Sequence, residues 1–255
     1  MYVSVYVGVV VGVSLLRNAL AGGVGGGVVE RALAGDADAE RELGLAALGG
    51  RLGRGLLEFA CGDVEGCCAE LSTVSALRRA VPGRFRVEFF YTDTKASWLC
   101  AVTMAECLGR GVLPDVEVVG SVQVPLFGGD PEAALSSLVD VVGRRLYGAV
   151  SAGADAYVVV TGGTKAEAVL ASMVAWLVGA RPVYRMEGGP LVVLPRLPIA
   201  LAGDFAEALC RAAGGRLEGA EELARTGLVV RRGGRYVVPR WVADLLAVRG
   251  LCRPG

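Results

Sequence analysis

The residues best suited to chemistry lie in the segment Thr161–Lys165, which reads Thr-Gly-Gly-Thr-Lys and follows the apolar run Tyr157–Val160. Its two glycines allow a sharp turn and a close approach of the backbone to a ligand. The apolar periodicity of Ala166–Val178 predicts a helix directly after it. Lys165 would therefore lie at a helix N-terminus, where free N–H groups and the helix dipole favour an anion. The segment predicts a phosphate-type loop at the end of a buried parallel strand.

The chain has 26 basic residues, and only two of them, Lys95 and Lys165, are lysine. Both follow a threonine just after an apolar strand. A lysine retained among arginines favours a site that needs a compact charge with three donors. Two lysines can also fall there by chance, and glycine-rich turns occur in α/β proteins without a phosphate ligand. We expect Lys165 to serve a ligand, and we leave the role of Lys95 open.

Ser14 is a second candidate, in the turn after the apolar run Val3–Val13. A serine at such a position usually caps the following helix. It can instead present its hydroxyl at the carboxyl end of a strand, where ligands of α/β proteins bind. The sequence leaves both roles open.

The chain has no histidine. This excludes Ser-His-Asp triads, Cys-His pairs, histidine-ligated zinc and ribonucleases with a histidine acid or base. Chemistry must come from lysine, hydroxyls, backbone N–H groups or carboxylates.

Seven cysteines without C-x-x-C spacing and without a secretory leader favour a reducing cytoplasm, in which most thiols are core residues. A metal site at Cys61, Cys67 and Cys68 is disfavoured, because adjacent cysteines point to different sides of a helix. We expect neither a metal nor another cofactor.

The charge and hydropathy of the chain limit the kinds of partner that it is expected to bind. The chain has 26 acidic and 26 basic residues, which argues against nucleic-acid binding through bulk charge and leaves room for local basic patches. The apolar run Tyr2–Val13 is too short to span a bilayer and is better explained as a first buried strand, so no membrane association is expected.

Strands alternate with helices along the first 200 residues, which predicts an α/β fold with a Rossmann-like, mostly parallel sheet and helices on both faces. Gly22–Gly27 is expected to be a flexible loop, and the loop 125–130 has no assigned role. Ser14, Asp93 and Lys165 all follow predicted strands, at the sheet edge where ligands bind. The predicted strands are Val3–Val13, Arg86–Tyr91, Val116–Val124, Tyr157–Val160, Val183–Met186 and Leu191–Leu194; the predicted helices are Ala37–Phe59, Glu65–Ala80, Ala96–Leu108, Pro131–Val150 and Ala166–Gly179.

The composition changes after Pro198. From Asp204 to Gly255 there are nine arginines and six acidic residues. Two helices, a hairpin turning at Gly233–Gly234 and a last helix from Arg240 outline a winged helix. A small dimerisation or docking domain fits the same pattern, and the modest charge does not favour DNA binding.

Four ordered motifs resemble the CRISPR-associated Rossmann-fold (CARF) family, and within it the ring nucleases that degrade cyclic oligoadenylates. Gly12–Asn18 is similar to the family's G-T-S-L-L-T-N, Cys68–Ser72 to S-A-E-L-N, and Thr92–Thr94 to S-D-T. Thr161–Glu167 is similar to T-G-G-F-K-x-E, and Pro195–Pro198, after Tyr184 and Glu187, also matches. The resemblance covers residues 1–200, so we expect a CARF domain at 1–200 and a winged-helix-like domain at 204–255.

The motifs depart from the family's pattern at Val13, Arg17 and Thr164, whereas the serine and lysine of ring nucleases are intact as Ser14 and Lys165. The resemblance implies that these two are catalytic. Many relatives carry a ribonuclease domain with an Arg-x4-6-His motif, which a chain without histidine lacks. The resemblance further implies ligand contacts from Gly12, Val13, Leu16, Arg17, Asn18, Asp93, Thr94, Thr161, Gly162, Gly163, Thr164 and Glu167.

The resemblance implies that the ligand is cyclic tetraadenylate. Each ribose 2′-hydroxyl would attack its own 3′-phosphate in line, without a metal, and give linear adenylates with 2′,3′-cyclic phosphate ends. Lys165 would stabilise the phosphorane, and Ser14 would fix the ribose or phosphate. With no evident general base, turnover should be slow. A pseudo-four-fold ring suits a homodimer in which each protomer supplies one Ser14 and Lys165 pair.

Two other functions compete. A ligand-gated DNA-binding regulator would share the same site and sense the ring without cleaving it. An ordinary dinucleotide-binding enzyme is weaker, because no G-x-G-x-x-G follows the first strand.

Overall fold

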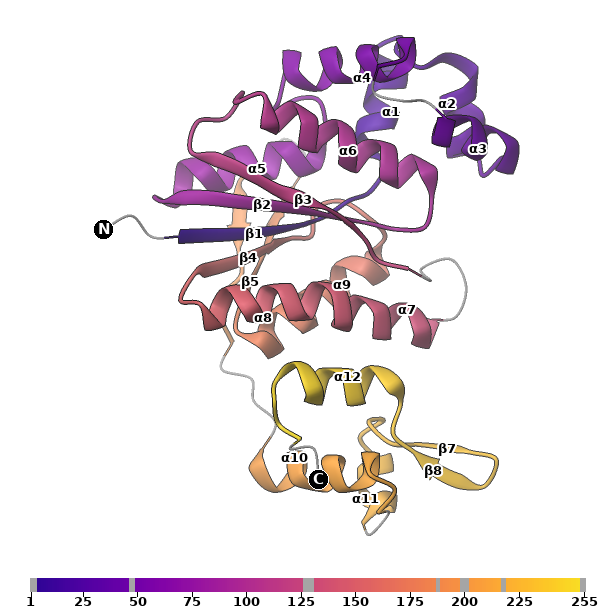
Figure 1. Cartoon of the computed structure of the whole chain (residues 1–255), viewed down its shortest axis with the longest axis vertical. Coiled ribbons are helices and arrows are strands. Elements are labelled where there is room, and N and C mark those ends of the chain that lie inside the picture. The colour runs from indigo at the N-terminus through magenta and orange to yellow at the C-terminus, as the bar shows by residue number, and fades with distance from the viewer. Residues whose placement is uncertain are drawn as a thin grey trace.

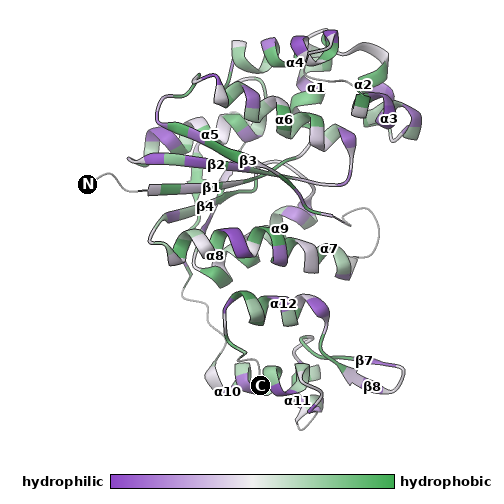
Figure 2. Ribbon diagram, viewed as in Figure 1, coloured by the Kyte–Doolittle hydropathy of each residue, from purple (hydrophilic) through white to green (hydrophobic). Residues whose placement is uncertain are grey.

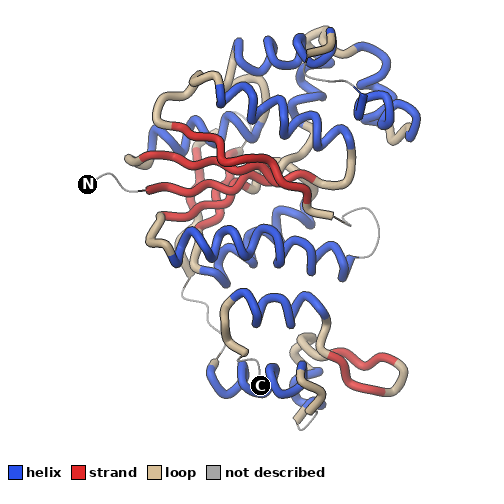
Figure 3. Tube along the Cα trace, in the orientation of Figure 1, coloured by secondary structure: helices blue, strands red, loops and turns tan. Residues whose placement is uncertain are grey.

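A computed structural model describes residues 4–45, 49–125, 131–186, 189–197, 202–216 and 219–252. A six-stranded sheet lies between two layers of helices (Figure 1, Figure 3). Its strand order is β3-β2-β1-β4-β5-β6, and all neighbours are parallel except β5 and β6. The predicted α/β fold is confirmed. The strands are β1 (Ser4–Val10), β2 (Arg84–Tyr91), β3 (Val116–Gln123), β4 (Asp155–Val159), β5 (Arg181–Arg185) and β6 (Leu191–Val193).

The central strand β1 is buried on both faces, as its unbroken apolar sequence predicts. Val5, Val7 and Val9 face one core, and Tyr6 and Val10 face the other. The green inner faces of the helices cover both sides of the sheet (Figure 2). The first core is covered by α1 (Ser14–Ala21), α2 (Gly26–Leu33), α3 (Ala37–Leu45), α4 (Arg51–Gly62), α5 (Ala69–Ala80) and α6 (Lys95–Gly109); the second by α7 (Pro131–Leu138), η1 (Val139–Gly143), α8 (Arg144–Ser151) and α9 (Lys165–Val178).

The helices differ from the prediction in four places. The helix predicted from Glu65 begins only at Ala69, as α5. The segment expected to be loop contains the start of α2, because Gly26 and Gly27 open a helix whose Val29 and Ala32 are buried. The single helix predicted over residues 37–59 is divided into α3 and α4. The helix predicted from Pro131 to Val150 contains one π-helical turn, η1. Most of the loop 125–130 lies outside the described residues.

The C-terminal segment forms α10 (Gly203–Ala213), α11 (Ala220–Ala224), the hairpin β7 (Val230–Arg232) and β8 (Arg235–Val237), and α12 (Arg240–Val248). The predicted turn is confirmed, since Gly233 and Gly234 both have positive φ, as a tight two-residue hairpin turn requires.

The helix α12 belongs to two cores at once. Val242 and Leu246 pack inside the C-terminal segment, whereas Leu245 and Val248 pack in the second core of the sheet domain. It lies against α7 and η1, and Ser136 of α7 donates a hydrogen bond to Asp244. The last helix is therefore a docking element and presents little of its apolar face to solvent.

Four of the cysteines are paired in disulfides, whereas the sequence predicted reduced thiols. Disulfides join Cys61 to Cys107, with 5.5 Å between the Cα atoms, and Cys210 to Cys252, with 5.4 Å. The first ties α4 to α6, and the second ties α10 to the residues after α12. Over the described ranges, no helix is both long and apolar enough to cross a bilayer, and no group of three potential metal ligands gathers.

Candidate functional site

The carboxyl ends of β1, β2 and β4 meet the N-termini of α1, α6 and α9 around a cavity of about 510 Å³. A second cavity of about 410 Å³ adjoins it and shares Ser14, Asn18, Ala69 and Thr161 with the first. The structure thus brings most of the expected site residues together. Those that line the first cavity are Gly12, Val13, Ser14, Arg17, Asn18, Thr94, Thr161, Gly162, Gly163, Thr164 and Glu167.

Three expected site residues lie elsewhere. Leu16 is fully buried in the first core and lines neither cavity, so its contact with a ligand stays a prediction. Asp93 is exposed and accepts a hydrogen bond from Gln123. Lys165 is exposed as the first residue of α9, next to the lining residue Thr164 but outside the lining of either cavity.

Glu70 is the buried centre of the site, and its side chain is 0% exposed. Its Oε1 accepts a hydrogen bond of 2.9 Å from the N–H of Gly12, and its Oε2 accepts one from the hydroxyl of Ser14. Glu70 lies within the motif Cys68–Ser72, from which no role for it was predicted. Glu70 is in the first turn of α5, and its neighbours Leu71 and Thr73 are buried. A charged residue among core positions of a helix is the signal that could have drawn attention to it.

The hydroxyl of Ser14 does not cap α1. Val13 occupies the N-cap position without a side-chain hydrogen bond, and Ser14 is the first helical residue. Its Oγ donates a hydrogen bond to Glu70 and accepts one of 3.2 Å from the N–H of Ala69. The capping role is therefore excluded, and the hydroxyl is held at the end of β1, facing both cavities.

The glycines of the site are required by packing within the protein. A Cβ on Gly12 would overlap the backbone of Gly163, and a Cβ on Gly162 would overlap the carboxylate of Glu70. Gly163 has φ of 81°, a conformation that favours glycine. The close approach that the sequence predicted is thus already made between the loop after β1, the loop after β4 and Glu70.

The start of α9 is capped from within. The side chain of Thr164 accepts from the N–H of Glu167, and the carboxylate of Glu167 accepts from the N–H of Thr164, which is a capping box. Burial raises the pKa of Glu167. Two first-turn N–H groups, those of Lys165 and Ala166, find no acceptor in the described part of the chain. The helix end therefore offers an anion fewer N–H donors than the sequence predicted.

Thr161 and Thr94 have structural partners. The hydroxyl of Thr161 lies 2.9 Å from that of Thr73 and accepts from the N–H of Arg185. The side chain of Thr94 caps α6 by accepting from the N–H of Ser97. Both residues therefore fix the loops on which the cavity is built.

The second lysine has a packing role. The stem of Lys95 lies against Gly44 of α3, and Glu40 accepts a hydrogen bond of 2.6 Å from the N–H of Lys95. A carboxylate from α3 thus occupies the N-terminus of α6, where an anion would otherwise bind. Lys95 therefore connects α6 to α3.

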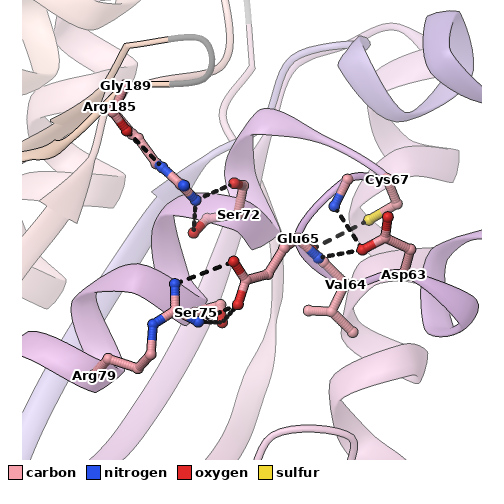
Figure 4. A network of polar contacts seen from close by, with 10 residues as sticks. Asp63, Val64, Glu65, Cys67, Ser72, Ser75, Arg79, Arg185 and Gly189 are labelled. Atoms are coloured by element: carbon pink, nitrogen blue, oxygen red, sulfur yellow. Dashed lines mark hydrogen bonds and ion pairs between the residues drawn. The ribbon is translucent and has the colours of Figure 1, made fainter.

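The second cavity contains a cation that the sequence analysis missed. Figure 4 shows Arg185 pointing towards Ser72 of α5, whose hydroxyl and carbonyl oxygen both accept from it. Its Nε donates 3.2 Å to the carbonyl of Gly189. Nearby, Arg79 pairs with Glu65 and lowers the pKa of that carboxyl. Among the described residues Arg185 forms no ion pair with a carboxylate, and its charge also helps to lower the pKa of Glu65.

Arg17 is a second such cation. It is exposed on α1, lines the first cavity, and has no acidic partner in the ranges that the structure covers. It stands where the resembling family has threonine. Because the two arginines lie in adjoining cavities, an extended anion that fills both would meet both charges.

Residues 65–197, just over half of the chain, match the family model described as "CRISPR-associated protein (Cas_APE2256)". No curated protein matches. Among solved structures, the chain is similar to one of Can2 from Sulfobacillus thermosulfidooxidans in complex with cyclic tetra-adenylate, with 12% sequence identity and a TM-score of 0.32. The similarity covers 97% of this chain and 64% of that one, so the chain spans less than two thirds of its length.

Proposed function

Because the chain belongs to the CRISPR-associated protein family Cas_APE2256, we propose that it binds cyclic tetraadenylate at the carboxyl edge of its sheet and cleaves the ring. Family membership confirms the CRISPR association that the motifs predicted. Ring cleavage would switch off type III CRISPR signalling. The observation that carries the proposal is the joint position of Ser14, the Gly162–Gly163 loop and the free arginine Arg17 around one cavity.

Binding would rest on charge and on backbone donors. Arg17 and Arg185 offer guanidinium groups without carboxylate partners in the described ranges, and guanidinium groups bind phosphates well. The N–H groups of Lys165 and Ala166 add donors at the start of α9. A ligand with several phosphates would use these groups together, whereas a single phosphate would reach only some of them.

Cleavage would rest mainly on positioning. A ribose 2′-hydroxyl held in line with its 3′-phosphate and the departing 5′ oxygen attacks the phosphorus and forms a 2′,3′-cyclic phosphate. Lys165 would stabilise the charge of the phosphorane from the edge of the cavity, where its stem allows its ammonium group to reach a bound ring. Ser14 would contact the ribose.

We also propose the domain division and the assembly. Residues 1–200 would form the ring-binding domain and residues 204–255 a winged-helix-like domain. The protein would be a homodimer, with the ring on the two-fold axis. One face of α9 supports this arrangement, since Lys165, Val169 and Met173 follow one another at helical spacing and all are exposed.

The C-terminal domain would act as a docking unit and not as a reader of DNA. The apolar residues of α12 are buried, some in the core of the C-terminal segment and some in the second core of the sheet domain. This helix is therefore not free to enter a major groove. Arg232 of the hairpin pairs with Glu132 of α7. If Arg231 and Arg232 nevertheless bound a specific duplex at nanomolar concentration, the docking role would be wrong.

The test is incubation of the pure protein with cyclic tetraadenylate in EDTA, with the products separated by chromatography. Linear adenylates that end in 2′,3′-cyclic phosphate support the proposal. A protein that binds the ring and leaves it intact after long incubation would instead be a sensor, such as a ring-gated transcriptional regulator.

A further inference from the structure

We propose that Glu70 is a positioning residue that acts through Ser14. It orients the Ser14 hydroxyl so that the serine oxygen accepts a hydrogen bond from a ribose 2′-hydroxyl, and it takes the proton that Ser14 passes on. This inference rests on the proposed ring cleavage. It supplies a base, a role that the motifs alone did not assign to any residue.

The hydrogen bonds of Ser14 leave one position open. A serine hydroxyl has one donor and two acceptor positions. The donor is directed to Oε2 of Glu70, and one acceptor position is filled by the N–H of Ala69. The remaining acceptor position faces the cavities that Ser14 lines. Ser14 can therefore accept from a hydroxyl of the ligand, but it has no proton left to give to a phosphate oxygen.

Glu70 is an unusual buried carboxylate. Buried charges are normally paired with an opposite charge, yet no arginine or lysine of the described ranges pairs with Glu70, whose side chain is 0% exposed. Its partners are the N–H of Gly12 and the hydroxyl of Ser14. Its place in the first turn of α5 lets the helix dipole favour its charge. Glu70 is therefore held beside Ser14 by hydrogen-bond donors, with no cation of the described ranges on its oxygens.

Glu88 provides the contrast within the same chain. It is 2% exposed, but Arg145 pairs with it and the hydroxyl of Tyr6 donates to it. Its charge is compensated locally, and it lies away from both cavities. Glu88 is therefore a structural buried glutamate, whereas Glu70 faces a hydroxyl that opens onto the site.

The chemical step is a proton relay from the ribose 2′-hydroxyl through Ser14 to Glu70. The 2′-hydroxyl gives its proton to the oxygen of Ser14 as the 2′ oxygen forms a bond to phosphorus. Ser14 at the same time gives its own proton to Oε2 of Glu70. The bond from phosphorus to the 5′ oxygen breaks, and that oxygen takes a proton from water. Glu70 then returns its proton to solvent, so the enzyme is unchanged and the products are a 2′,3′-cyclic phosphate and a 5′-hydroxyl.

The experiment compares Glu70→Gln, Ser14→Ala and the double variant. Glutamine keeps the shape, but its amide has one acceptor and one donor group, so it cannot accept from both Gly12 and Ser14. We expect single-turnover cleavage by Glu70→Gln to fall about a hundredfold or more, with ring affinity changed less than about threefold. The double variant should be no slower than the slower single variant, because the two residues act as one unit.

Glu88→Gln is the matched control. It should lower the melting temperature and leave cleavage at the wild-type rate when assayed well below that temperature. The inference is overturned if Glu70→Gln cleaves like the wild type, if it loses affinity as much as rate, or if the effects of the two single variants multiply. A wild type that leaves the ring intact would overturn ring cleavage itself, and this inference with it, whereas a cleaving wild type isolates the role of Glu70.

Discussion

Gly162 and Glu70 are in such close contact that a methyl group on Gly162 would overlap the carboxylate of Glu70. Gly162→Ala must therefore move either the loop or the glutamate. We expect a loss of about 1–3 kcal/mol in the free energy of unfolding and a slower cleavage reaction, because Ser14 loses its partner. Gly109→Ala, at a helical position with nothing near the added methyl, should unfold at the same or a higher urea concentration. Equal urea midpoints for Gly162→Ala and the wild type would contradict the tight packing.

Lys165→Ala should slow ring cleavage by a hundred- to a thousandfold and leave binding largely in place. Lys165 is exposed in the free protein. Once a bound ring excludes water from it, one charge-stabilising donor contributes ~3–4 kcal/mol to the transition state, whereas ground-state binding is shared among several phosphates. Lys95→Ala is the control, since Lys95 packs on Gly44, and it should cleave like the wild type. A Lys165→Ala variant with wild-type rate would remove lysine from the mechanism.

The exposed apolar face of α9 should hold the homodimer together. Val169 is 59% and Met173 43% exposed. Replacing both with glutamate should convert a dimer into a monomer in light scattering, because four charges would face one another across the two-fold axis. Val237→Glu, at a comparably exposed position on β8, should remain dimeric. A wild type that is monomeric and binds the ring one-to-one would disprove the dimer.

Glu167→Gln should make stability less dependent on pH. Burial raises the pKa of Glu167 in the folded state, so its contribution is most favourable below the unfolded pKa of about 4.3 and is lost as pH rises through the folded value. Glutamine keeps the capping box without the buried charge. The variant should therefore gain stability relative to the wild type as pH rises from about 4.3 towards neutrality, as measured by urea unfolding. A constant difference across that range would show that burial of the charge costs nothing.

The disulfide between Cys210 and Cys252 closes a loop with a sequence separation of 42. Cys210→Ser should lower the free energy of unfolding by about 4 kcal/mol, on the chain-entropy estimate for a loop of that length. Cys252→Ser should give the same loss, and combining the two should add little, since either one breaks the same bond. If a reducing agent leaves the unfolding of the wild type unchanged, the bond does not stabilise the protein.

The sheet and the place of the site were predictable from the sequence. Unbroken apolar strands and glycine-rich turns follow local rules, and the carboxyl ends of parallel strands meet at one edge. Contacts between distant segments were not predictable. Glu70 meets Ser14 across 56 residues and Arg185 meets Ser72 across 113, and no local pattern fixes either pair. The burial of Leu16 in the first core was not predictable either, because a motif letter does not say which face of a helix it occupies.

Glycine content misled the prediction at α2. Gly26 and Gly27 have poor helix propensity, yet the helix forms because Val29 and Ala32 are buried against the first core. Tertiary packing outweighed local preference there. The same limit applies to the cysteines, since pairing depends on a fold that brings Cα atoms within about 6 Å, which spacing in the sequence does not reveal.

The shared helix α12 has a consequence for how the protein is made. A ribosome releases the chain from its N-terminus, so all strands of the large sheet emerge before Leu245 and Val248 do. Until then α7 and η1 lack the helix that packs against them in the finished protein. The nascent sheet domain therefore exposes an apolar surface on these elements that α12 covers later. Loss of α12 would leave an aggregation-prone intermediate that chaperones and proteases recognise.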